Sequence, residues 1–290
     1  MEEYAIELEN VSKQYDGFLL DKISFKVIKG TVMGFVGQNG SGKTTTIKAL
    51  LGINKIDEGN IKINGRDILD KELVKGDIGV IFDEIPFQQN LKIYQLQRML
   101  KYFFINWNDE VFLNYIKKFN LPLKKKISEL SKGMKMKLQI ATCLSHNAKT
   151  LIMDEPTTGL DPVVRNEILN EFMDFMLDED HSILISSHIT SDLEKIADSI
   201  TFIHNGKMLL SDDKNMILEN FGIYRCADIK NIPIKEEDIV SIRKNEFGYE
   251  VMTRNITSYK SNNIEFDKAS LDEIMLFHVK GTASSKEWTL

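Results

Sequence analysis

Hydrophobic and polar residues alternate in two segments near the start of the chain. Ile6 and Leu8 alternate with glutamates, and Ile23, Phe25 and Val27 alternate with polar residues. A repeat of two residues places one set of side chains on each face of a strand, so both segments are predicted to be half-buried β-strands. A third alternating segment, at residues 61–63, ends in an Asn-Gly turn signal.

Short apolar runs without this alternation occur at residues 32–36, 78–82, 150–153 and 182–185. Strands that are covered on both faces have this composition, which is typical of a parallel sheet with helices on each side. We therefore expect an α/β core with an antiparallel β subdomain beside it.

The pattern turns helical between Pro86 and about His146, where apolar residues recur every three to four positions. This pattern predicts a helical subdomain inserted into the α/β core. Its aromatic run at residues 102–104, followed by Trp107, has two interpretations. The run is either core of the insertion, which we favour, or a surface that docks a partner.

The composition shifts after Asp212, and a mixed α+β pattern follows. Strands are expected near residues 239–242 and 249–252, and a closing helix from Ser270, with Glu273 as its capping partner. We predict a large domain over residues 1–212, with its helical subdomain at about 86–146, and a small C-terminal extension over residues 216–290. Nothing in the extension has the pattern of catalytic residues, so a dimer-contact or regulatory role is expected.

A glycine-rich segment separates the apolar run at 32–36 from a helical pattern that stops at Gly52. Glycines at 37, 40 and 42 would let successive backbone N–H groups point at phosphate oxygens, and the helix behind them adds its positive dipole end. Lys43 can reach the β- and γ-phosphates, and the Thr44 hydroxyl can bind Mg²⁺. The segment matches the phosphate-binding pattern G-x-x-x-x-G-K-T in the required strand, loop and helix context.

Two acids, Asp154 and Glu155, end the apolar run at 150–153. In open parallel sheets ligands bind at the carboxyl ends of the strands, so these acids are expected near the phosphate-binding segment. We assign Asp154 to Mg²⁺ and Glu155 to the base that deprotonates the attacking water.

The composition limits the classes of function. The chain has 37 Lys and Arg against 43 Asp and Glu, a formal net charge of −6, which does not support nucleic-acid binding as the main role but leaves room for a local basic patch. No apolar run approaches the ~20 residues of a membrane-spanning helix. The two cysteines, Cys143 and Cys226, lack metal-ligand spacing and fit a reduced cytoplasm.

Further motifs surround the two acids in a fixed order. The segment Leu130-Ser131-Lys132-Gly133-Met134 precedes them, Gly159-Leu160-Asp161-Pro162 follows them, and His188 comes just after the apolar run at 182–185. Over residues 4–212 the sequence thus resembles the ATPases of ATP-binding cassette (ABC) transporters. The motifs of that family, in order, are Walker A, Q-loop, signature, Walker B, D-loop and H-switch.

The resemblance implies a role for each matching residue. His188 would contact the γ-phosphate, Tyr15 would stack on adenine, and Asp161 would act across a dimer of two cassettes. Ser131 and Gly133 of one chain would close over ATP held by the other. The triphosphate itself would be bound by Gly37, Asn39, Gly40, Ser41, Gly42, Lys43, Thr44 and Thr45.

Two positions depart from the family pattern. Lys132 and Met134 replace Gly and Gln of the signature LSGGQ, and Lys132 could either add charge toward phosphate or be solvated. At the Q-loop, Asp83 stands in place of Gln, followed by Glu84. Asp83 could bind Mg²⁺ directly, because its side chain is short and charged.

The resemblance implies a function: ATP hydrolysis that drives a membrane transporter, with ATP and Mg²⁺ bound between two cassettes. The permease would be a separate multi-span protein that docks between Asp83 and the helical subdomain, at the cytoplasmic face of a bacterial plasma membrane. The C-terminal extension resembles those of bacterial exporters of the ABC-2 type, including peptide exporters, so we favour export. The alternatives are a soluble ABC ATPase in translation or DNA repair, and a regulatory subunit that does not hydrolyse ATP.

Overall fold

A six-stranded sheet forms the centre of the protein in the computed structural model, which describes residues 3–68, 76–229, 232–262 and 264–280. Its strands pair in parallel, except that the edge strand β10 runs antiparallel to β9. The strand order is β10 (Lys207–Asp213), β9 (Ser199–His204), β3 (Val32–Val36), β8 (Ser182–Ser187), β7 (Thr150–Asp154), β6 (Ile78–Phe82).

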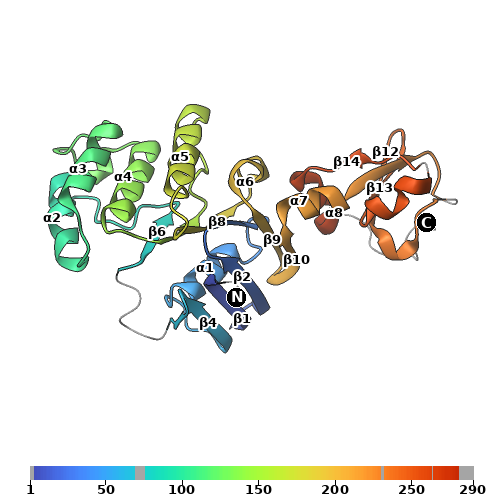
Figure 1. Cartoon of the computed structure of the whole chain (residues 1–290), viewed down its shortest axis with the longest axis horizontal. Coiled ribbons are helices and arrows are strands. Elements are labelled where there is room, and N and C mark those ends of the chain that lie inside the picture. Colours follow the sequence, from blue (N-terminus) through green and yellow to red (C-terminus); the bar gives the residue numbers. More distant parts are fainter. Residues whose placement is uncertain (1–2, 69–75, 230–231, 263, 281–290) are drawn as a thin grey trace.

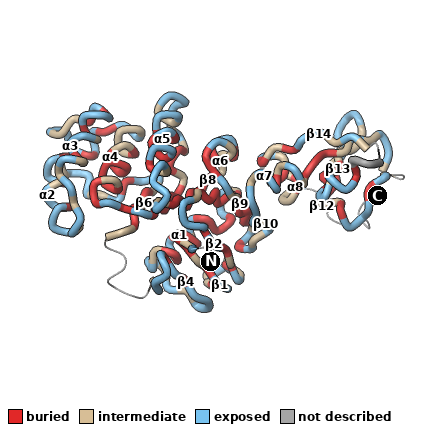
Figure 2. The backbone as a smooth tube through the Cα atoms, in the orientation of Figure 1, coloured by how far each residue is buried: buried red, intermediate tan, exposed pale blue. Residues whose placement is uncertain are grey.

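The central strands are buried along their whole length. Every residue of β3, β7 and β8 is buried, as their continuous apolar sequence predicts. Figure 2 shows this buried centre of the sheet near the labels β8 and β9. Because the strands are parallel, the residues that follow β3, β6, β7 and β8 all come out at the same edge of the sheet.

An antiparallel sheet packs beside this core, below it in Figure 1. Its order is β2 (Phe18–Ile28), β1 (Tyr4–Tyr15), β4 (Glu58–Ile63), β5 (Arg66–Asp67). The alternating residues Ile6 and Leu8 point into a core that also contains Phe35 of β3 and Ile47 of helix α1 (Lys43–Leu50). Helix α1 is therefore held between the two sheets.

Helices at the left end of Figure 1 form the insertion. They are α2 (Ile93–Phe103), α3 (Asp109–Lys118), the short 3₁₀ helix η1 (Ile127–Glu129) and α4 (Lys132–Ser145). The residues of the aromatic run, which we interpreted as core, differ in their exposure. Phe104 stacks on His146, with ring centroids 4.0 Å apart, whereas Tyr102 and Phe103 are 91% and 66% exposed. The interpretation as core was therefore wrong for Tyr102 and Phe103.

Two further helices, α5 (Pro162–Phe175) and α6 (Thr190–Ile196), follow the strands β7 and β8. The C-terminal part begins with α7 (Lys214–Asn220) and contains a sheet of order β12 (Ile239–Asn245), β13 (Gly248–Thr253), β11 (Gly222–Cys226), β14 (Asp267–Lys268). It also contains the 3₁₀ helices η2 (Glu236–Asp238) and η3 (Ile256–Asn262), and α8 (Leu271–Lys280) is its last described element. None of the described helices combines the length and the apolar character needed to cross a bilayer.

Helix α8, the last described helix, packs against the central core. Ser270 and Glu273 form the predicted capping pair at the start of α8. Leu271 and Phe277 are buried in the same cluster as Leu193 of α6, and the backbone N–H of Leu271 donates to Glu194 Oε1 at 3.0 Å. Helix α8 is thus packed against the α/β core.

Candidate active site

The loop between β3 and α1 depends on its glycines. Gly40 and Gly42 have φ angles of 80° and 115°, which residues with a Cβ rarely adopt. A Cβ at Gly37 would lie 2.4 Å from both the carbonyl oxygen of Ile203 and the hydroxyl oxygen of Ser41. The loop can take this shape only because these positions lack side chains.

The loop and the start of α1 form a cradle for an anion. The N-cap residue of α1 is Gly42, which supplies no side-chain hydrogen bond, and the first turn contains no acid. The first N–H groups of a helix have no acceptor within the helix, so those of Lys43, Thr44 and Thr45 can bind a phosphate group. The buried Ser41 hydroxyl also has no hydrogen-bond partner in the described structure. A pocket of about 210 Å³ lies over this cradle, lined by loop residues, by Phe18 and by Glu155.

Lys43 is one of the residues that line this pocket. Its side chain is buried, and its ammonium group donates to the carbonyl oxygen of Gly37 at 2.6 Å. The same nitrogen lies 3.1 Å from Glu155 Oε1, so the lysine and the carboxylate form a close ion pair. A positive charge is thus fixed beside the N-terminus of α1, where the β- and γ-phosphates of a nucleotide would lie.

Thr44 and Asp154 meet at the same edge of the sheet. The Thr44 hydroxyl donates to Asp154 Oδ2 at 2.8 Å, and the Ser186 hydroxyl donates to Asp154 Oδ1 at 2.6 Å. A hydroxyl and a carboxylate are ligands that Mg²⁺ accepts. The described residues contain no cluster of three His, Cys, Asp or Glu that could enclose a metal. The pair therefore fits Mg²⁺ that is bound mainly through phosphates and water.

Glu155 contacts His188 on the side away from Lys43. Glu155 Oε2 lies 2.7 Å from His188 Nδ1 and accepts a hydrogen bond from the Thr158 hydroxyl at 2.8 Å. The backbone of Glu155 has φ of 54°, an uncommon conformation for a residue other than glycine. Its N–H donates to the carbonyl oxygen of Ser186 at 3.1 Å, which holds this conformation in place.

The surroundings of Glu155 also set its ionisation. Burial acts to raise its pKa, but the hydrogen bond from Thr158 and the charge of Lys43 outweigh burial, so the pKa lies below its usual value. Glu155 is therefore ionised at neutral pH and can accept a proton. Sequence reasoning missed Thr158 and Ser186, although both are polar residues that follow or end apolar strands.

Tyr15 lies near the pocket without lining it. Its hydroxyl accepts a hydrogen bond from Asn54 at 2.8 Å, and its ring centroid lies 6.5 Å from that of Phe18. Phe18, three residues later in the same hairpin, lines the pocket instead and lies 3.1 Å from the position of a Cβ on Gly42. The structure thus adds a second aromatic candidate for contact with a base.

The signature and D-loop residues lie on neighbouring helix starts. Ser131 is the N-cap of α4, and its hydroxyl accepts from the N–H of Met134 at 3.3 Å. Asp161 is the N-cap of α5, and a Cβ on Gly133 would lie 2.9 Å from Val164 of that helix. Ser131, Gly133 and Asp161 do not line the phosphate pocket of their own chain.

Asp83 lies beside Lys132. The Asp83 carboxylate is 2.5 Å from the Lys132 ammonium nitrogen. Among the described residues no hydrogen bond or ion pair joins Asp83 to Thr44 or Asp154, the pair expected to share Mg²⁺ with it. Asp83 and Lys132 line a groove of about 360 Å³ that also includes Glu84, Gln89 and Lys135.

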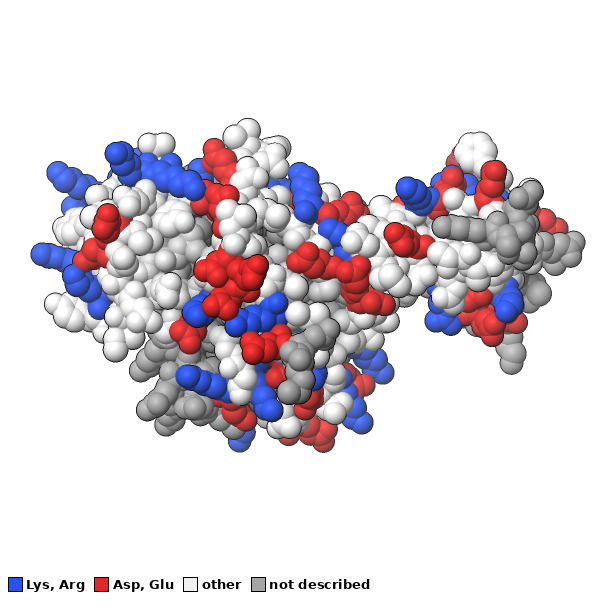
Figure 3. Space-filling model, in the orientation of Figure 1, with Lys and Arg blue, Asp and Glu red and all other residues white. Residues whose placement is uncertain are grey.

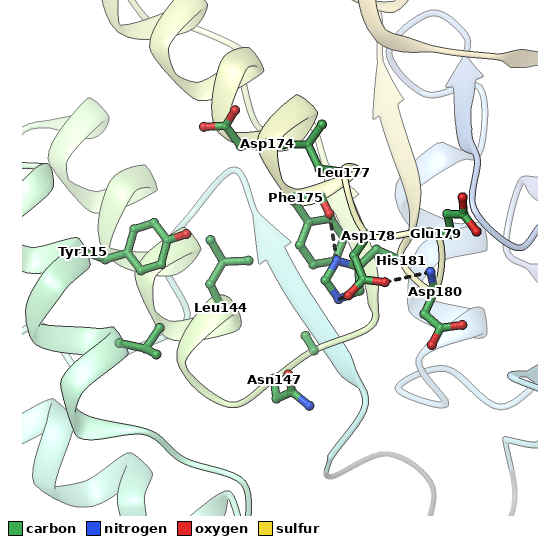
Figure 4. Close-up of a pocket in the computed structure, with 12 residues that line it drawn as sticks. Tyr115, Leu144, Asn147, Asp174, Phe175, Leu177, Asp178, Glu179, Asp180 and His181 are labelled. Carbon is green, nitrogen blue, oxygen red and sulfur yellow. Dashed lines mark hydrogen bonds and ion pairs between the residues drawn. The ribbon is translucent and has the colours of Figure 1, made fainter.

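The pocket of about 900 Å³ in Figure 4 lies near the opposite edge of the sheet. Its lining comes from residues that precede β7 and β8, whereas Asp154 and Ser187 end those strands. Four acids, Asp174, Asp178, Glu179 and Asp180, line it. These acids would repel a triphosphate, so the smaller pocket over α1 is the candidate nucleotide site.

The fold and the site together define a P-loop NTPase: a parallel sheet, a glycine loop before a helix, a buried lysine, and a threonine bonded to the acid that ends strand β7. Comparison with known proteins narrows this class. Residues 20–158 match the family described as ABC transporter.

Relatives and solved structures extend the match. The chain is 35% identical to the lantibiotic transport ATP-binding protein SrtF of Streptococcus pyogenes, over 72% of this chain and 90% of the relative. It is 35% identical to the ABC transporter ATP-binding protein YhcH of Bacillus subtilis, over 74% of this chain and 72% of that protein. It is 32% identical to the bacitracin transport ATP-binding protein BcrA of Enterococcus faecalis, over 71% of this chain and 68% of that protein.

An ATP-binding subunit of an ABC transporter superposes with a TM-score of 0.67 and 25% identity, over 74% of this chain and 92% of that one. A dimeric cassette bound to ADP and phosphate superposes with a TM-score of 0.64 at 18% identity, over 72% of this chain and 98% of that one. This superposition shows that the two proteins share a fold. The chain belongs to the ATP-binding proteins of ABC transporters. It is an ATP-binding and ATP-hydrolysing transport subunit, as the resemblance implied.

Proposed function

We propose that the hydrolytic step depends on Glu155 as the base, with Lys43 and His188 on either side of it. The observation that carries this proposal is that one carboxylate, with a side chain only 14% exposed, contacts both of these residues. Glu155 accepts a proton from the attacking water, and His188 orients the carboxylate and reaches toward the γ-phosphate. Thr44 and Asp154 would hold Mg²⁺, and the ion would neutralise charge on the phosphates.

Two copies of the cassette complete each site. Ser131 and Gly133 lie at the N-terminus of α4, a helix of 14 residues, and lie outside the phosphate pocket of their own chain. The N–H groups and the dipole at such a helix start bind anions. In a head-to-tail pair, this helix start of one copy covers the γ-phosphate held by the other, and Asp161 contacts the partner.

A separate multi-span permease receives the motion of the two cassettes. Its cytoplasmic helix docks in the groove lined by Asp83 and Lys135, at the junction of the α/β core and the helical subdomain. The complex lies at the cytoplasmic face of a bacterial plasma membrane. Two relatives are transport proteins for a lantibiotic and for bacitracin, which supports export of peptides or similar compounds.

The domain division at residues 212–216 and the role of the extension are also proposed. Residues 1–212 hold the ATPase site, and residues 216–290 regulate or join the dimer. Deletion of residues 216–290 tests this role, but it also removes Leu271 and Phe277 from the core that they share with α6. A point variant in the extension that leaves α8 intact is therefore the better test.

The transporter assignment is tested by affinity purification of the tagged chain from detergent-solubilised bacterial membranes. We expect a multi-span protein to co-purify, and ATP to stabilise a dimer of the cassette. Co-purification with ribosomes or DNA would favour the soluble ABC ATPase instead. Release of phosphate from MgATP by the wild-type chain, but not by Glu155→Gln, would exclude the regulatory subunit that does not hydrolyse ATP.

A further inference from the structure

The helical subdomain differs in charge from the rest of the protein. Residues 86–146 contain eleven Lys and Arg against three Asp and Glu, a formal charge of +8, although the whole chain carries −6. Figure 3 shows Lys and Arg side chains gathered at the end of the molecule that α2, α3 and α4 occupy in Figure 1. This is a local basic surface on an acidic protein.

Four of these lysines form a lysine cluster, which consists of Lys92, Lys124, Lys125 and Lys126. Lys92 pairs with Lys126 through the backbone, and the N–H of Ile93 donates to the carbonyl oxygen of Lys125. The segments before α2 and before η1 are thus bonded side by side. Lys124, Lys125 and Lys126 are exposed, and the ammonium groups of the cluster form no ion pair with an acid of the described residues. One acid lies nearby: the Glu129 carboxylate accepts a hydrogen bond from the backbone N–H of Lys126 at 3.0 Å.

Aromatic side chains continue this surface along α2. The N–H of Tyr94 donates to the carbonyl oxygen of Leu123, next to the cluster. Residues four apart lie on one face of a helix, so Tyr94, Arg98 and Tyr102 share the outer face of α2. Tyr94 is 37% exposed, Tyr102 is 91% exposed, and Ile105 just after the helix is also exposed.

The composition of this surface fits an anionic bilayer. Clusters of four or more lysines are attracted to acidic lipid headgroups, and Tyr side chains are enriched at the level of those headgroups. Lysine is a flexible point charge, whereas arginine has the fork that binds a carboxylate in a fixed geometry. The cluster contains only lysine, which favours a diffuse anionic surface over one shaped acidic partner.

The cluster also lies beside the groove proposed for the permease. The N–H of Ser128 donates to the carbonyl oxygen of Gln89, which lines that groove, and the N–H of Ile127 donates to the carbonyl oxygen of Leu91. One pair of segments, residues 89–94 and 123–128, therefore joins the groove to the cluster. A permease in the groove would bring the bilayer to this side of the helical subdomain; this placement rests on the proposed function.

We propose that the lysine cluster and the outer face of α2 bind the anionic headgroups of the membrane that holds the permease. The contact holds the helical subdomain against the bilayer independently of nucleotide. It gives the chain a preference for acidic lipids that does not depend on the permease.

The test is sedimentation of the purified full chain with vesicles. We expect binding to vesicles of phosphatidylglycerol and phosphatidylcholine, no binding to phosphatidylcholine alone, and release by salt. The triple change Lys124→Glu, Lys125→Glu and Lys126→Glu should weaken binding at least ~100-fold. The matched control is Lys55→Glu, Lys62→Glu and Lys244→Glu, three exposed lysines outside the helical subdomain with the same change in charge; it should weaken binding much less.

Three outcomes would overturn the proposal: no binding of the wild-type chain to acidic vesicles, equal losses in the two triple variants, or binding to DNA in preference to vesicles. ATP hydrolysis of each variant in detergent-free buffer shows that the variant is folded. Vesicle binding by a chain that does not hydrolyse ATP would reject the proposed mechanism and leave this inference intact. Hydrolysis of ATP by a chain that does not bind vesicles would reject this inference and leave the proposed mechanism intact.

Discussion

The Asp83 carboxylate lies 2.5 Å from the Lys132 ammonium nitrogen, so the residue that follows β6 is joined to the first residue of α4. These are two positions at which the sequence departs from the family motifs, and the structure pairs them. A Cβ on Gly159 would lie 3.3 Å from the same nitrogen, so Lys132 also borders the D-loop. The pair thus links the Q-loop, the signature and the D-loop within one chain.

This pair can exchange partners at low cost. The side chains of Asp83 and Lys132 are 44% and 41% exposed, and an exposed pair stabilises a protein by only ~0–1 kcal/mol. In the proposed dimer, Lys132 could turn from Asp83 to the phosphate of the nucleotide held by the partner. Asp83→Asn should then release Lys132 and lower, by about 2–5-fold, the ATP concentration that gives half-maximal hydrolysis.

The control for this prediction is the same substitution in a Lys132→Gln background, where Asp83→Asn should have no effect. A double-mutant cycle on the half-maximal ATP concentration measures the coupling. Equal effects of Asp83→Asn in both backgrounds would show that Asp83 acts on something other than Lys132.

Glu155→Gln should slow hydrolysis by about 10²–10⁴-fold, because an amide cannot accept the proton of the attacking water. ATP should still bind, and a nucleotide-bound dimer should accumulate in size-exclusion chromatography. A matched control is Glu167→Gln, which changes a carboxylate on α5 that is half-exposed and paired with Lys137. Phosphate release by Glu155→Gln at the wild-type rate would remove Glu155 from the role of base.

Lys43→Ala should weaken binding of MgATP at least ~10-fold, because the lysine makes a charge-assisted contact with phosphate that no neighbour replaces. Isothermal titration calorimetry measures this loss. Lys48→Ala is the control, since Lys48 is an exposed lysine near the end of the same helix. Equal affinities of the two variants would place the phosphates elsewhere.

The arrangement of the core could be predicted from the sequence, because each strand type has its own pattern. The alternation around Ile6 and Leu8 and the continuous apolar run of β7 correctly indicated an antiparallel sheet beside a parallel one. The carboxyl ends of parallel strands meet at one edge, so Asp154 could be expected near Thr44, and the two lie in hydrogen-bond contact.

Other features depend on contacts between distant segments that leave no local pattern. Lys132 could have been solvated or directed to phosphate, and its pairing with Asp83 arises only because β6 and α4 pack together. The family resemblance pointed to Tyr15 as the aromatic that stacks on adenine, yet the turn of the hairpin places Phe18 against the phosphate loop. The packing of α8 on α6 joins residues about 80 positions apart and likewise had no signal in the sequence.

A buried carboxylate stabilises the C-terminal part of the protein. Asp238 accepts hydrogen bonds from the Tyr259 hydroxyl at 2.6 Å and from Asn255 Nδ2 at 2.7 Å. Burial acts to raise the pKa of Asp238, but these hydrogen bonds outweigh it, so the pKa lies below its ordinary value of 3.8. The ionised group therefore stabilises the fold above the pKa of the unfolded chain, and this contribution is lost as the pH falls through the lower folded value.

Tyr259→Phe should lower the free energy of unfolding by about 1–3 kcal/mol at pH 7, because a buried carboxylate loses a donor. The deficit should shrink as the pH is lowered below about 4, where Asp238 in the unfolded chain is protonated. Urea denaturation at several pH values measures both effects. Tyr224→Phe is the matched control, since Tyr224 packs at the edge of the same small core and its hydroxyl has no hydrogen-bond partner among the described residues. If the loss of unfolding free energy is equal in the two variants, or constant with pH, the hydrogen bond from Tyr259 does not stabilise the ionised form of Asp238.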